Sequence, residues 1–260
     1  MNALLKHIAT TKLLWLLIFV PVVIVFAKLK PESHTQLFVL SVFAIVPLTV
    51  LLSHATESVA AKTGDAIGGL LNATLGNLAE LIIALTALRA GQYMLVKASI
   101  AGPIVANTLF IMGAAFFLGG LKHHVQEYNK VSAHLQAALL LLATIALLIP
   151  SAIAQADSTM SAPFIQNLSV GLAVLLIMAY GLGLLFSLKT HKELFASVQH
   201  AEEGEAPWPM AVALSTLAVV TVLVALVSDI FVESVQKAAE TFGMTPAFVG
   251  FVIVALVGGA

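Results

Sequence analysis

Long apolar runs separated by short polar stretches dominate the sequence. A membrane-spanning helix needs about 20 mostly apolar residues. Seven segments reach or approach that length, and they are residues 13–29, 34–53, 66–88, 98–119, 132–150, 164–187 and 208–229. An eighth run begins near Pro246 and reaches Ala260 after 15 residues, which is short for a crossing. The pattern predicts an all-α polytopic membrane protein, and we expect the sequence given to stop inside a longer architecture.

Composition supports the membrane class and excludes several others. The chain is 60% hydrophobic and 10% charged, with a mean hydropathy of +1.04, whereas soluble domains average about 25% charged residues. A net charge of −1 gives no indication of nucleic-acid binding, and the absence of cysteine excludes disulfides and thiolate chemistry. The first apolar run is followed by Lys28, Lys30 and Pro31 rather than by a small-residue cleavage site, so we expect a retained helix.

A polar stretch at residues 188–207 is the one obvious linker, and it separates six spans from the beginning of a second part. It carries Glu202, Glu203 and Glu205, which form either a solvated loop or a regulatory site that concentrates cations. Basic residues weakly favour a cytoplasmic N-terminus and linker. On the N-terminal side these are Lys6, Lys12, Lys62, Lys122, Lys130, Lys189 and Lys192, against Lys28, Lys30, Arg89, Lys97 and Lys237 on the other.

Two stretches of the chain resemble each other. TESVAAKTG at residues 56–64 is echoed by VESVQKAAETFG at residues 232–243, and each precedes an apolar run that contains glycines. Pairing Gly76 with Gly258 also pairs Gly68 with Gly250. The first copy opens the third span and the second opens the eighth, so the copies enter the membrane from opposite faces. This arrangement indicates an inverted-topology repeat, which is common in secondary transporters.

Polar residues lie inside the third apolar run. At helical pitch Asn72, Gly76 and Glu80 share one face, with Asn77 at its edge. Gly76 is a candidate break that frees backbone carbonyls, and unwound backbone at membrane depth persists only inside protein or beside a cavity. An ionised carboxylate at the bilayer centre costs about 2.5–3.5 kcal/mol. The residues therefore form a functional site or, in the alternative, hold neighbouring helices together.

The fourth run offers a partner face for these groups, because Ser99 and Asn107 are eight residues apart, with Gly102 and Ala106 allowing close helix approach. Carboxylate, carboxamide and carbonyl oxygens together are the ligands that Ca²⁺ takes. One glutamate cannot neutralise a divalent ion, so we expect a second acid nearby; none lies at depth between residues 90 and 230. His54 and Glu57 precede the site as membrane-boundary residues or as a proton relay.

No hydrolase motif or nucleotide-binding loop is present in the sequence, so neither an enzyme nor an ATP-driven pump is supported, and no cofactor is expected.

Four stretches resemble the calcium/proton exchangers of the cation/calcium exchanger superfamily. GGLLNATLGNLAELI at residues 68–82 is similar to the family's first signature, with a G-N-x-x-E core at Gly76, Asn77 and Glu80. Residues 98–124 resemble the helix that follows, residues 186–195 with the acidic run resemble the linker, and residues 228–260 resemble the start of the second signature.

The resemblance implies a fold of two inverted five-helix halves with an additional N-terminal helix. The corresponding regions are residues 1–33 for that helix, 34–187 for the first half, 188–207 for a cytoplasmic linker and 208–260 for an incomplete second half. It implies that Glu80 binds Ca²⁺ or a proton in turn. Side chains of Asn77 and Asn107, and carbonyls near Ala73 and Gly76, would complete the shell, with Asn72 on the same face.

The sequence departs from the family pattern at three points. Pro103 replaces a serine and is expected to bend its helix. Gly258-Gly259 replaces a G-N pair, which makes the two halves unequal, and the second glutamate would fall near position 262, beyond the sequence given.

The function implied is proton-driven export of Ca²⁺, or of other cations, across a bacterial inner membrane. The partners expected are Ca²⁺, H⁺, the lipid bilayer and a second copy of the chain. A Na⁺-coupled exchanger, a passive cation channel and a non-transporting scaffold remain alternatives.

Overall fold

The computed structural model describes residues 2–156, 162–195 and 207–258, and every regular element in these ranges is helical. The chain divides into two compact units. Unit 1 comprises Met1–His124 and Ala206–Ala260, and unit 2 comprises Val125–Glu205. The repeated motifs and the residues of the predicted site within 2–258 belong to unit 1.

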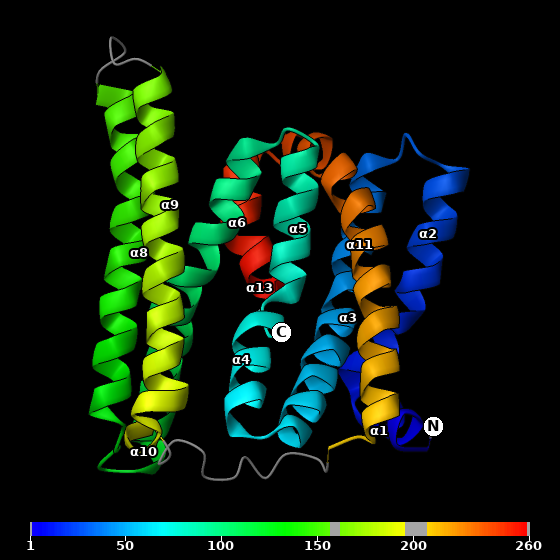
Figure 1. Ribbon diagram of the computed structural model, residues 1–260. Helices are drawn as coiled ribbons and strands as arrows, with labels where there is room; N and C mark the ends of the chain where they lie inside the picture. Colours follow the sequence, from blue (N-terminus) through cyan, green and yellow to red (C-terminus); the bar gives the residue numbers. More distant parts are fainter. Residues whose placement is uncertain (1, 157–161, 196–206, 259–260) are drawn as a thin grey trace. The chain divides into compact units, whose positions relative to one another are not determined.

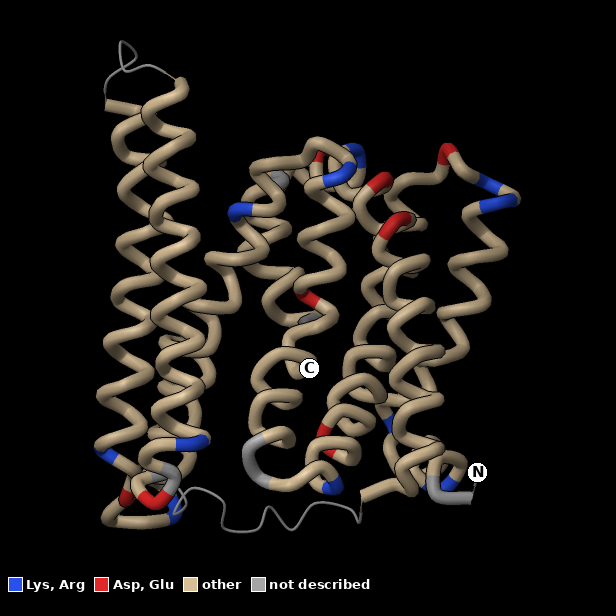
Figure 2. The backbone as a smooth tube through the Cα atoms, viewed as in Figure 1, with Lys and Arg blue, Asp and Glu red and all other residues tan. Residues whose placement is uncertain are grey.

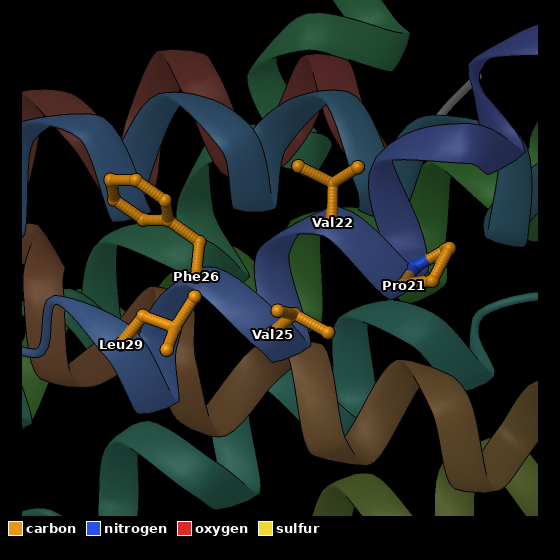
Figure 3. A pocket seen from close by; sticks show the side chains of 5 residues that line it. All are labelled: Pro21, Val22, Val25, Phe26 and Leu29. Carbon is orange, nitrogen blue, oxygen red and sulfur yellow. The ribbon is translucent and has the colours of Figure 1, made fainter.

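The N-terminal segment of unit 1 forms the first membrane span. A short helix α1 (Asn2–Thr10) leads into a 3₁₀ helix η1 (Lys12–Ile18) and then α2 (Phe19–Leu29), and residues 12–29 together are long and apolar enough to cross a membrane. Leu14 and Val23 are fully buried against the rest of the unit. One face of α2 instead lines a shallow apolar hollow of about 350 Å³, shown in Figure 3 with Pro21, Val22, Val25, Phe26 and Leu29.

Two long helices form the centre of unit 1. They are α3 (His34–Thr63) and α11 (Met210–Thr241), which pack against each other along their length (Figure 1). Phe38, early in α3, stacks on Phe231, late in α11, at 5.4 Å between ring centroids. At the other end the Trp208 backbone N–H donates to the Ser58 hydroxyl at 3.1 Å. The helices are therefore antiparallel, as the inverted repeat predicts, and their buried faces form the apolar core.

The third span is broken, as expected at Gly76. It consists of α4 (Asp65–Leu75) and α5 (Leu78–Arg89), which are bent by 43° at the break. The fourth span follows as α6 (Tyr93–Val105), a π-helical turn η2 (Ala106–Ile111) and α7 (Met112–Lys122). Pro103 lies inside α6 without ending it, and the helix widens into η2 three residues later.

The second signature enters from the opposite end of unit 1 (Figure 1). It comprises α12 (Pro246–Phe248), a π-helix η5 (Val249–Val254) and α13 (Ala255–Gly258), without an interruption between them. Figure 2 shows charged residues gathered mainly toward the two ends of the unit's helices, and an acidic position at mid-height on α5. The part of the chain between the ends is thus largely apolar, as a bilayer requires.

Unit 2 is a helical hairpin of α8 (Lys130–Ala156) and α9 (Ala162–Leu185), followed by a π-helical turn η3 (Phe186–Thr190) and a short helix α10 (Lys192–Phe195). Asn129 links the start of α8 to α10. Its side-chain oxygen Oδ1 accepts the Ser132 N–H at 3.0 Å, and its side-chain Nδ2 donates to the Leu194 carbonyl at 2.7 Å. The predicted acidic cluster of Glu202, Glu203 and Glu205 lies outside the described residues.

Among the described residues, six helices are long and apolar enough to span a membrane, and the broken pair α4–α5 makes a seventh. The seven predicted spans are therefore confirmed. Two of the predicted ends are too early by ten residues or more, because α3 continues from residue 53 to Thr63 and α11 from residue 229 to Thr241.

Candidate cation site at the broken helix

The break between α4 and α5 depends on Gly76. Its backbone N–H donates to the Asn72 carbonyl at 2.9 Å. A Cβ atom at this position would lie 2.5 Å from that same carbonyl oxygen, so any other residue would have to displace it. The sequence places the one residue without a side chain where the two helix ends meet. The last turn of α4 and the first turn of α5 therefore meet at this bend.

Glu80 lies in the first turn of α5. A carboxylate is favoured there, because the unsatisfied N–H groups of a helix N-terminus carry partial positive charge. Its Oε2 atom is buried and has no hydrogen-bond partner among the described residues. Burying a polar atom without a partner costs free energy, so binding of a proton or a cation at this oxygen is favoured.

Three of the other predicted site residues flank this break, and a fourth lies in the fourth span. Asn72 and Ala73 lie in the last turn of α4, and Asn77 holds the N-cap position of α5, although its side chain forms no capping hydrogen bond. Asn107 lies in η2, after α6, which packs against α5. All three asparagine side chains are exposed in the isolated chain. The expectation of a single face for Asn72, Gly76 and Glu80 assumes one continuous helix, and the 43° bend interrupts that register.

The second signature reaches the same level of unit 1. Helix α13 packs against both α3 and α5. The buried Thr49 hydroxyl on α3 shares its hydrogen between the Val257 carbonyl on α13, at 3.1 Å, and the Val46 carbonyl of its own helix, at 2.7 Å. Gly258 ends α13, while Gly259 lies outside the described residues. The sequence alone does not single out Thr49, whose only signal is a hydroxyl within the apolar run 34–53.

The approach of α6 to the second signature is backbone to backbone. A Cβ on Gly102 would lie 2.5 Å from the Phe251 carbonyl oxygen, and one on Gly250 would lie 2.7 Å from the Ala98 Cβ. Gly102 thus permits close helix approach as predicted, but its partner is the second signature rather than the third span. The sequence could not show this, because the contact joins residues almost 150 positions apart.

His54 packs into a cluster that the sequence did not reveal. Its ring stacks on His7 of α1 at 4.4 Å between centroids and meets Trp208 edge-on at 4.4 Å. Trp208 directly precedes α11 and is almost fully buried. The cluster joins the N-terminal segment, the end of α3 and the start of α11.

A broken membrane span that carries an acid with a buried oxygen, beside an inverted copy of the same motif, is typical of secondary transporters. Comparison with known proteins agrees with it. The family model described as "Sodium/calcium exchanger protein" matches residues 33–189.

A Ca²⁺/H⁺ antiporter of Aphanothece halophytica is 36% identical over 94% of this chain and 69% of its own length. The Ca²⁺/H⁺ antiporter ChaA of Bacillus subtilis is 39% identical over 91% of this chain and 68% of its own. The crystal structure of the Ca²⁺/H⁺ antiporter protein YfkE superposes with a TM-score of 0.73 at 32% identity, covering 94% of this chain and 68% of that one. The chain therefore belongs to the sodium/calcium exchanger family, among its Ca²⁺/H⁺ antiporters, and spans about two thirds of the length of these relatives.

Proposed function

We propose that the protein exchanges Ca²⁺ for H⁺ across a membrane. Relatives named Ca²⁺/H⁺ antiporters support Ca²⁺ and H⁺ as the ions exchanged, and the matching family is one of exchangers. We further propose that protons entering down their gradient drive Ca²⁺ out of the cytoplasm of a bacterium, through its inner membrane. The weak excess of basic residues on the N-terminal side supports a cytoplasmic N-terminus.

The observation that carries the proposed site is the buried Glu80 Oε2 without a partner, located at a helix break. Ca²⁺ requires the ionised carboxylate, whereas a proton neutralises it, so the two cannot occupy the same oxygen together. Neutral oxygens would come from Asn77 and Asn107 and from carbonyls near Ala73 and Gly76, with Asn72 close to the break. Competition for one carboxylate makes the movement of each ion depend on the other.

Replacement of Glu80 by glutamine tests this role, because glutamine keeps the shape and removes the charge. In vesicles that contain the complete gene product, we expect Glu80→Gln to reduce pH-driven Ca²⁺ flux by at least about 100-fold. Changes to outer-shell partners of a metal already cost roughly 10–100-fold in affinity, and a charged ligand is worth more. The matched control is Glu233→Gln, which removes an exposed acid near the end of α11. Flux like that of the wild type in Glu80→Gln would refute the assignment.

A second candidate is Na⁺-coupled exchange, which the name of the matching family model favours. Vesicles with a Na⁺ gradient at equal pH on both sides distinguish the two candidates. Uphill Ca²⁺ movement driven by pH alone supports the proton-coupled exchanger, and movement driven by Na⁺ alone supports the rival. Ca²⁺ that only equilibrates under either gradient would indicate a passive channel.

A further inference from the structure

A groove of about 340 Å³ opens between the N-terminal segment and the two long helices of unit 1. Leu4 and Ile8 of α1, Leu17 of η1, and residues of α3 and α11 line it. Ser215 and Thr216 are the only polar side chains among its lining residues. Because four elements contribute, the groove results from tertiary packing. The hollow on α2 in Figure 3 is lined from one helix only, and nothing shows what covers it.

The groove lies at membrane depth. On α3 it reaches Leu48 and Leu51, which belong to the apolar run, and on α11 it reaches Val219 and Leu223 within a membrane span. Hydrocarbon rather than water surrounds these positions in a bilayer. A groove left empty would lose the dispersion contacts of its lining, so an apolar chain is favoured there. Its volume is at the low end for small-ligand sites, about 300–1,000 Å³, and suits one chain rather than another helix.

The end of the groove that α1 lines carries the features of a membrane interface. Leu4 and Ile8 are four residues apart and share a face of α1, while Lys6 falls on the opposite face and is exposed. Lys12 opens η1, and Trp15, three residues later, is 65% exposed. Lysine and tryptophan together mark the headgroup level of a bilayer, and an amphipathic helix with its apolar face inward lies in that plane.

The N-terminal segment that lines this end of the groove carries charge of one sign. The sequence contains no acidic residue before Glu32, so Lys6 and Lys12 have no carboxylate on their own segment to neutralise them. A negatively charged phosphate at the headgroup level complements both lysines, and a headgroup without net charge does so less well.

We propose that this groove binds one acyl chain of an anionic glycerophospholipid whose phosphate group pairs with Lys6 and Lys12. The inference rests on the membrane location that the family implies and not on which ions the protein carries. The lipid would tie α1 and η1 to α3 and α11. It would thus stabilise the packing between the N-terminal segment and the central helix pair.

Photo-crosslinking tests the site. The complete gene product is placed in vesicles that contain phosphatidylglycerol or phosphatidylcholine with the same diazirine-labelled acyl chain, and the labelled peptides are mapped by mass spectrometry. We expect labelling at Leu17, Val219 and Leu223 to favour phosphatidylglycerol roughly thirtyfold, because each lysine at an anionic surface contributes about a fivefold preference. Lys6→Gln combined with Lys12→Gln should abolish the preference. Lys28→Gln combined with Lys30→Gln, at the other end of the same span, should leave it unchanged.

Two exposed valines of α11 provide a matched pair. Val219 lines the groove and Val222 does not, yet both are 59% exposed. Val219→Trp should fill the groove and remove the labelling at Leu17 and Leu223, whereas Val222→Trp should retain it. Labelling that ignores the headgroup, or that survives Val219→Trp, would overturn the proposal. If the protein runs as a dimer and neither lipid labels Leu17 or Leu223, the groove belongs instead to the contact with a second copy. Because Glu80→Gln leaves the groove intact, its labelling should persist even where exchange is lost, so the two proposals fail separately.

Discussion

The two signatures of unit 1 begin with the same kind of contact and then diverge. Each has a buried glycine that brings its backbone against a neighbouring helix. Gly68 of α4 meets the Ala60 carbonyl of α3, and Gly250 of η5 meets Ala98 and the Leu95 carbonyl of α6. Between the paired glycines, the first signature runs to Gly76 as the α-helix α4 and carries Asn72, whereas the second runs to Gly258 through the π-helix η5 and α13 and has Val254 at the position paired with Asn72.

The comparison distinguishes two roles of the motif, which are close helix packing and the proposed ion binding. The shared glycines serve helix packing, which both copies need in order to cross the centre of the unit. The polar residues belong to the proposed ion site, and within the paired stretches only the first copy has one, because Asn72 is paired with Val254. Close packing is therefore the feature that the two paired stretches share.

The largest effect is expected from adding one methyl group to Gly68 or Gly250, which should lower the free energy of unfolding. In Gly68→Ala the new Cβ would lie 2.4 Å from the Ala60 carbonyl oxygen, and in Gly250→Ala it would lie 2.7 Å from a side-chain methyl. Overpacking of this kind costs about 1–3 kcal/mol. We expect both variants to unfold at lower temperature in detergent, because neither a backbone carbonyl nor the Ala98 Cβ can move aside without its helix.

Gly113→Ala is the control for both glycine variants. Gly113 lies in α7, and a Cβ there would meet nothing within 4 Å. Alanine is the better helix former by about 1 kcal/mol, so this variant should be as stable as the wild type or more stable. An equal loss in all three variants would show that the glycines serve flexibility rather than close packing.

A smaller effect is expected from Thr49→Val, which removes a contact between α3 and the second signature. Valine keeps the shape and removes the hydrogen bond from Thr49 to the Val257 carbonyl. Interhelical hydrogen bonds in membranes contribute about 0.6 kcal/mol on average, with a maximum near 1.7. Because this bond holds α13 against α3, we expect a modest fall in unfolding temperature together with weaker Ca²⁺ affinity.

Thr221→Val is the matched control for Thr49→Val. The Thr221 hydroxyl bonds only the Leu217 carbonyl within its own helix, at 2.7 Å, and no tertiary contact depends on that bond. If Thr221→Val and Thr49→Val change Ca²⁺ affinity equally, the link from α3 to α13 has no special role.

The sequence predicted the spans and the break well, because both depend on local properties. Apolar length identifies a crossing, and Gly76 among polar residues identifies a place where a helix can end. The sequence did not predict that α3 and α11 continue to Thr63 and Thr241, because residues that follow an apolar run can remain helical in polar surroundings. Nor could it pair Gly102 with Phe251 or His54 with His7 and Trp208, because those contacts exist only after distant segments pack.

The role of Glu80 as the group for which Ca²⁺ and protons compete can be measured without a membrane gradient. Purified protein in weakly buffered detergent solution is titrated with Ca²⁺, and the protons released per bound Ca²⁺ are recorded with a pH indicator. We predict proton release from the wild type and from Glu233→Gln. We predict markedly less release per bound ion from Glu80→Gln, because the glutamine side chain has no titratable proton to release. If Glu80→Gln releases as many protons for each Ca²⁺ bound as the wild type, the competition takes place elsewhere and the proposed coupling is wrong.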